Sequence, residues 1–129
     1  MIVVDASVVV DLLLEEDFSP KVIDKLSEYG DIVAPYLVDH EVLNSIWRQL
    51  RLGKIDVARA DLAIDDLANL TIARKPTHGV NHRIWDLRDN LTPYDAAYVA
   101  LAEILEVPLV TRDTKIARAA QLFTPVIVL

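Results

Sequence analysis

The sequence comprises 129 residues, of which 53% are hydrophobic and none is cysteine, and its formal net charge is −7. This length predicts one domain, residues 1–129, and the apolar content excludes a disordered chain. The absence of cysteine excludes disulfides and thiolate metal sites, and the acidic balance argues against non-specific coating of nucleic acid. No basic leader precedes the first apolar run, and no run has the length of a membrane span. We therefore expect a cytoplasmic protein with no membrane partner.

Short apolar runs alternate with segments of helical periodicity along the chain. In chain order the pattern predicts a strand at 2–4, helices at 7–15 and 20–29, a strand at 31–34, helices at 35–52 and 55–68, a strand at 70–73, helices at 78–90 and 92–106, a strand at 108–110, a helix at 114–122 and a strand at 126–129. Pro35 is assigned to the first turn of its helix, where proline is tolerated. The alternation predicts an α/β fold, a three-layer α/β/α sandwich with a mainly parallel central sheet.

Two aspartates follow strands of this predicted sheet. Asp5 comes directly after the strand at 2–4, and Asp113 follows the strand at 108–110. The carboxyl ends of parallel strands share one edge, which is where open α/β sheets place their ligand sites. Aspartate is also a preferred N-cap, so helix capping explains each of the two equally well when it is taken alone.

Two further acids lie on predicted helices. Asp95 stands three residues after Thr92, as in a capping box, and the helix that it opens, AAYVALAEIL, is apolar nearly all round. We therefore expect Asp95 to enter the core with that helix. Glu41 shares a polar stripe with Asn44 and Arg48, alongside an apolar stripe of the same helix. The polar stripe is either a solvated face or a carboxylate and its supporting amide facing a shared cavity.

The segments VVDASV, PYLVDHEVLNSIW, LTPYDAAYVALAE and LVTRD, in this order, resemble the PIN-domain family, and most closely its small toxins of the VapC kind. The resemblance covers essentially the whole chain, and TPYDAAYVALAE followed by PLVTRD is its specific part. It implies a metal-dependent endoribonuclease, a phosphodiester hydrolase that is the toxin of a type II toxin–antitoxin pair. It also implies three partners: a VapB-like antitoxin, an RNA substrate and a second copy in a homodimer.

The resemblance also implies, by position, which residues form the site. The catalytic and metal-binding acids are Asp5, Glu41, Asp95 and Asp113. The supporting polar side chains are Ser7, Asn44 and Thr111. Nearby cations that are candidates for contact with RNA are Arg48, Arg112 and Lys115.

The chemistry of four converging carboxylates favours a metal ion independently of the family. Such groups repel one another, and a hard divalent cation, Mg²⁺ or Mn²⁺, removes the conflict. Such an ion activates water and holds a phosphate oxygen. We expect cleavage of single-stranded or loop regions of RNA, because A-form duplex hides its base edges and an acidic chain has no broad basic surface for it. The alternative is a PIN-like interaction module with negligible turnover, which a metal-dependent cleavage assay separates from a nuclease.

The first two predicted helices contain more apolar residues than one face packed against the core requires. They are Val9, Leu13, Val22, Ile23 and Leu26. Either all of them are core, or some form a groove for a partner helix. Trp47 and Trp85 stand among apolar neighbours, and we expect them in the core or in an interface rather than as platforms for stacked bases.

Overall fold

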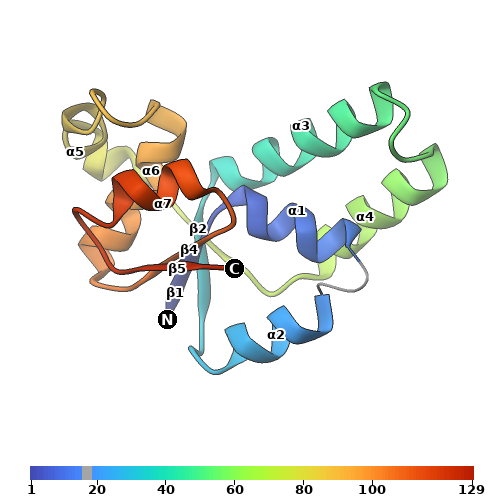
Figure 1. Cartoon of the computed structure of the whole chain (residues 1–129), viewed down its shortest axis with the longest axis horizontal. Coiled ribbons are helices and arrows are strands. Elements are labelled where there is room, and N and C mark those ends of the chain that lie inside the picture. The colour runs from blue at the N-terminus through green and yellow to red at the C-terminus, as the bar shows by residue number, and fades with distance from the viewer. Residues whose placement is uncertain (16–18) are drawn as a thin grey trace.

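The computed structural model describes residues 1–15 and 19–129, and it contains a five-stranded sheet in the order β3-β2-β1-β4-β5 (Figure 1). The strands are β1 (Ile2–Val4), β2 (Ile32–Pro35), β3 (Ala73–Lys75), β4 (Leu109–Thr111) and β5 (Val126–Val128). Each strand is parallel to its neighbours. The helices are α1 (Ala6–Leu14), α2 (Ser19–Ser27), α3 (Leu37–Arg51), α4 (Val57–Asn69), the short 3₁₀ helix η1 (His78–Val80), α5 (Asn81–Asp86), α6 (Pro93–Leu105) and α7 (Thr114–Ala120).

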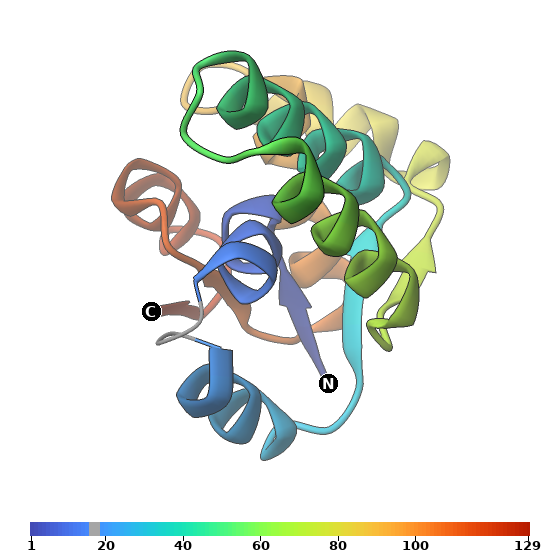
Figure 2. The ribbon, with the colours of Figure 1, turned by 90° about the vertical axis from the view of Figure 1, so that its right-hand side faces the viewer.

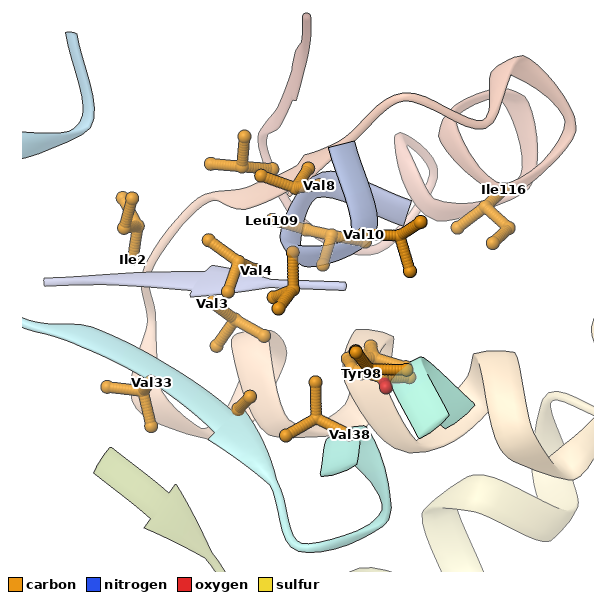
Figure 3. Close-up of a cluster of buried hydrophobic side chains, with 14 of the residues drawn as sticks. Ile2, Val3, Val4, Val8, Val10, Val33, Val38, Tyr98, Leu109 and Ile116 are labelled. Carbon is orange, nitrogen blue, oxygen red and sulfur yellow. The ribbon is translucent and has the colours of Figure 1, made fainter. Parts of the chain in front are cut away.

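Helices cover both faces of the sheet, so the predicted three-layer α/β/α architecture is confirmed. Figure 3 shows Val8 and Val10 of α1 on one side of β1, and Tyr98 of α6 on the other. The two central strands are buried on both faces, as their apolar sequences require. Figure 2 shows α1 between α7 and the α3–α4 pair. Within the described residues, no helix is both long enough and apolar enough to cross a membrane.

The strand order fixes where a ligand site can form. The chain moves outward from β1 to β2 and β3, and then returns across the sheet to β4 and β5. The connections that leave β1 and β4 therefore diverge, which opens a crevice outside the carboxyl ends of these two neighbouring strands. The segments that begin at Asp5 and at Arg112 lie at this crevice.

Two of the predicted boundaries are wrong because pairing between distant segments determines them. Pro35 ends β2 instead of opening a helix: it pairs with Lys75, while β1 pairs with β2 only as far as Val33. A proline is tolerated there because its missing N–H has no second strand to bond. The third strand lies at 73–75 rather than 70–73. The Arg74 guanidinium in this strand donates two hydrogen bonds to the Asp39 carboxylate of α3, at 2.7 and 3.0 Å.

The structure also differs from two further predictions, which concern the helix at 78–90 and the burial of two tryptophans. The helix predicted at 78–90 is a 3₁₀ turn followed by the short α5, which ends at Asp86. Of the two places expected for Trp47 and Trp85, the core is excluded, because they are 56% and 60% exposed, and an interface stays a prediction. Each has an arginine over its ring, Arg51 at 5.8 Å and Arg88 at 5.0 Å.

Candidate active site

Asp5 is a buried carboxylate at the junction of β1 and α1. It is 2% exposed, and its Oδ1 accepts hydrogen bonds from the Ser7 hydroxyl at 2.5 Å and from the Val8 N–H at 3.2 Å. The Thr111 hydroxyl donates to Oδ2. Burial raises the pKa of Asp5, the bonds from Ser7, Thr111 and Val8 lower it, and the charge of Asp113 raises it further. Asp5 therefore caps α1 and is also a desolvated acid held by three donors.

The same two hydroxyl groups join the β1–α1 junction to the β4–α7 junction. The Ser7 oxygen accepts from the Arg112 N–H at 3.0 Å, and the Thr111 oxygen accepts from the Asp113 N–H at 2.9 Å. Asp113 in turn caps α7, because its Oδ1 accepts from the backbone N–H groups of Lys115 at 2.8 Å and of residue 116 at 3.2 Å. Asp5 and Asp113 are thus fixed on opposite sides of the crevice, each at the start of a helix.

Glu41 and Asp95 approach this pair from the other elements. Burial raises the pKa of Glu41, the nearby Tyr98 hydroxyl lowers it, and the charges of Asp95 and Asp5 raise it. Burial also raises the pKa of Asp95, which the Thr92 side chain lowers and the charge of Asp113 raises. The four acids are therefore linked by charge repulsion: Asp113 acts on Asp5 and Asp95, and Asp5 and Asp95 act on Glu41. The expectation that Asp95 enters the core is wrong, because Asp95 is half-buried and the buried part of α6 begins at residue 96.

The four acids share a region without forming a closed metal cage. Within the described residues, no three side chains of the His, Cys, Asp and Glu types lie close enough together to hold a metal ion. The donors are nevertheless all oxygen atoms, which hard divalent cations prefer. The buried Oε1 atom of Glu41 has no hydrogen-bond partner in the described part of the chain. A mutually repelling, all-oxygen set with one unpaired acceptor fits a divalent cation.

Two surface depressions meet at Ser7, one on each side of the first turn of α1. The first, of about 420 Å³, lies between α1 and α3, and Glu41, Asn44 and Arg48 are among its lining residues. The second, of about 440 Å³, lies beside the start of α7 and is lined by Ser7, Arg112, Asp113, Thr114 and Lys115. The polar stripe of α3, which comprises Glu41, Asn44 and Arg48, therefore lines one depression. Asn44 and Arg48 are exposed there, and Glu41 is half-buried.

The structure brings to this region one acid, Asp11, that is not among the site residues predicted from the sequence. Asp11 lines the first depression, and its Oδ2 lies 2.8 Å from the guanidinium of Arg112, which also contacts Glu15 at 3.2 Å. Burial raises the pKa of Asp11, whereas the charge of Arg112 lowers it. The available signal was spacing, because Ser7 and Asp11 are four residues apart and share one face of α1. The guanidinium of Arg112 is thus paired with Asp11 of α1 and with Glu15, which follows that helix.

Comparisons with known proteins agree with this geometry. The PIN-domain family model matches residues 2–122. VapC ribonuclease Mb0985 of Mycobacterium bovis is 35% identical over 128 residues, which cover 99% of this chain and 98% of the relative. Ribonuclease VapC1 of Mycobacterium tuberculosis is 40% identical over 118 residues, 91% of this chain and 89% of the relative. The chain therefore belongs to the PIN-domain family, and the resemblance inferred from its motifs is confirmed.

Solved structures agree on the fold. PAE2754 from Pyrobaculum aerophilum superposes with a TM-score of 0.68 at 24% identity, covering 97% of this chain and 87% of that chain. FitAcB from Neisseria gonorrhoeae superposes with a TM-score of 0.66 at 17% identity, covering 98% of this chain and 96% of that chain. At these identities the likeness shows a common fold and nothing further.

Proposed function

We propose that this chain is an endoribonuclease of the VapC kind, the toxin component of a type II toxin–antitoxin pair, which depends on Mg²⁺ or Mn²⁺. The observation that carries the proposal is the mutual influence of Asp5, Glu41, Asp95 and Asp113, whose charges reach one another at the switch point of the sheet. Relatives that are 35% and 40% identical over nearly the whole chain are named ribonucleases. Carboxyl groups whose pKa values are raised by burial and by neighbouring acids, as those of Asp5, Glu41 and Asp95 are, are typical of functional sites.

Each acid has a separate part in this proposal. Asp5 is the central metal ligand, Asp95 and Asp113 are ligands directly or through water, and Glu41 is a ligand or orients the attacking water. When bound, the cation lowers the pKa of a water molecule and offsets charge on the phosphate. The chain supplies the orientation: the hydroxyls of Ser7 and Thr111 hold the Asp5 carboxylate from two sides. Backbone N–H groups at the start of α7 hold Asp113.

The substrate strand follows the two depressions, crossing the site at Ser7. Arg48 lines the first depression, and Arg112 and Lys115 line the second, so cations flank the acids on both sides. Asn44 offers an amide beside Glu41. A single strand follows such a path, whereas a rigid duplex needs a broad basic surface that a chain of net charge −7 does not offer. Cleavage therefore falls in unpaired RNA and weakens as salt is added.

One labelled hairpin RNA, compared with its fully paired counterpart at matched ionic strength, tests this function. With Mg²⁺ present, the chain should cut the hairpin in its loop and leave the duplex intact, and EDTA or the Asp5→Asn variant should abolish cutting. Equal cutting of both RNAs would contradict the single-strand path. Tight binding of a partner without any metal-dependent cutting would instead favour the interaction module.

We also propose an antitoxin partner, whose docking site includes an apolar cavity at the amino edge of the sheet. This cavity, of about 560 Å³, is lined in part by Val9, Ile23 and Leu26. Of the five groove candidates, Ile23 is 48% exposed, whereas the other four, Val9, Leu13, Val22 and Leu26, are buried in the core. Hydrogen exchange that shows no protection of the helices around this cavity on adding the antitoxin would count against it. Homodimer formation, expected from the family, is measured by sedimentation equilibrium.

A further inference from the structure

Tyr98 carries a buried hydroxyl that the surrounding core does not explain. The residue lies on α6 and is 2% exposed. Among the described residues, the buried side-chain polar atoms without a hydrogen-bond partner are the Tyr98 hydroxyl and Glu41 Oε1. Figure 3 shows this hydroxyl directed towards α3, the helix that carries Glu41. Leaving a buried polar group unpaired is costly, so phenylalanine would suit a purely structural position better.

The two unpaired atoms belong to neighbouring side chains. The Tyr98 hydroxyl is near enough to Glu41 to lower the pKa of that carboxyl, whereas burial, followed by Glu41, raises the pKa of Tyr98 well above its usual value of 10.0. As the two side chains lie, neither Glu41 Oε1 nor the Tyr98 hydroxyl has a hydrogen-bond partner among the described residues. A small rotation of either side chain would let the hydroxyl donate to the carboxylate and would satisfy both atoms together.

The other acids of the site show what Glu41 lacks. Asp5 is held by the hydroxyls of Ser7 and Thr111, and Asp113 is held by backbone N–H groups. Glu41 has the longer side chain and more rotatable bonds, so it needs a donor more than the aspartates do. The buried donor beside it that is left without another partner is Tyr98.

We propose that the Tyr98 hydroxyl is a positioning donor for Glu41. It donates to one carboxylate oxygen, so that the other is directed towards the divalent cation or the attacking water. Tyr98 touches neither substrate nor metal and acts only through Glu41, as outer-shell partners of metal ligands do. The inference rests on the proposed function, because it assigns Glu41 a task at a metal-dependent site.

The test compares Tyr98→Phe with wild type and with Tyr29→Phe, which removes a hydroxyl from a residue at the amino edge of the sheet, away from the acids. Each protein is titrated with Mg²⁺ while its melting temperature and its rate of RNA cleavage are recorded. Without metal, Tyr98→Phe should melt near the wild-type temperature, because phenylalanine keeps the buried ring and loses only the hydroxyl. The Mg²⁺ concentration for half-maximal stabilisation and for half-maximal rate should rise about tenfold or more, with KM for RNA unchanged. Tyr29→Phe should match wild type.

Each remaining outcome overturns the inference. A half-maximal Mg²⁺ concentration within about twofold of wild type would make Tyr98 a packing residue. In a Glu41→Gln background, Tyr98→Phe should cause little additional loss, and a fully additive loss would contradict action through Glu41. If wild type itself neither binds Mg²⁺ nor cuts RNA, the proposed function fails as well, a result distinct from a failure confined to Tyr98→Phe.

Discussion

Thr111→Val is the sharpest perturbation of the site that leaves its shape unchanged. Thr111 is 0% exposed at the end of β4, and valine has nearly the same shape and suits a buried strand. By hydrophobicity alone the substitution should stabilise the protein. However, the threonine oxygen is used twice, since it donates to Asp5 and accepts from the Asp113 N–H at 2.9 Å. The variant removes both bonds and leaves both partners in place.

The expected loss follows from these two bonds. A hydrogen bond to a charged group contributes about 1.5–3 kcal/mol, and an unsatisfied part-buried N–H costs about 1 kcal/mol more. Burying a methyl group in place of a hydroxyl returns about 1 kcal/mol. The net destabilisation of Thr111→Val is then about 2 kcal/mol, a substantial part of the roughly 5–15 kcal/mol that stabilises a typical domain. The pKa of Asp5 should rise as well, because one of the bonds that lower it is gone.

Urea unfolding in EDTA near neutral pH measures this loss, with Thr111→Ser as the matched control. Serine keeps the hydroxyl and loses one methyl group, so it should cost about 1 kcal/mol and retain cleavage. Valine should cost more than serine and should slow cleavage by about 10- to 100-fold. If the valine variant is as stable as wild type, then the Thr111 hydroxyl does not hold Asp5 and the bridge between the two junctions has no energetic role.

Three further predictions address the charges of the site. Asp5→Asn keeps an oxygen for the cap but removes a buried charge. Cleavage should therefore be lost, while the melting temperature in EDTA should be unchanged or higher. A markedly lower melting temperature would show that Asp5 is mainly a helix cap. Burial raises the pKa of Asp5, Glu41 and Asp95, so the folded state binds more protons than the unfolded chain does. The free energy of unfolding in EDTA should therefore fall as the pH rises from about 4 to neutral, and a rise would refute this. Arg112→Ala should slow cleavage without changing Mg²⁺ affinity and should cost about 1 kcal/mol, because it breaks ion pairs with two acids. Arg118→Ala, exposed on α7, is its control.

Three of the four candidate acids could be placed near one edge of the sheet from the sequence, because each is attached to a local signal. Asp5 directly follows an apolar run, Asp113 comes three residues after the end of one, and Asp95 follows the Thr92 cap of its helix. A parallel sheet then brings strand ends together whatever the details of packing. The position of β3 has no such signal, since the pairing of Arg74 with Asp39, 35 residues away, helps to fix its register. Local hydrophobicity favoured 70–73, which begins three residues too early.

The sequence reveals less about the polar groups that support the acids. Tyr98 stands in an apolar helix, so the sequence predicts a core residue, and Tyr98 is one. Its hydroxyl lacks a partner because of the way α3 lies against α6, which the sequence does not reveal. The contact of Arg112 with Asp11 joins opposite ends of the chain, and no spacing rule predicts it. Exposure of Trp47 was missed for a related reason: apolar neighbours in sequence do not determine which face of a helix is covered.

The structure also shows why capping and function need not be alternatives at Asp5. Capping α1 requires one acceptor oxygen, and serine or asparagine supplies it without a buried charge beside Asp113 and Glu41. The carboxylate is present despite its desolvation, and Ser7 and Thr111 hold it in place. A capping residue has a fixed position at the start of its helix. Asp5 and Asp113 cap α1 and α7, and these helices follow the adjacent parallel strands β1 and β4. The fold thus places two anchored carboxylates at its switch point, and their repulsion is what a cation would relieve.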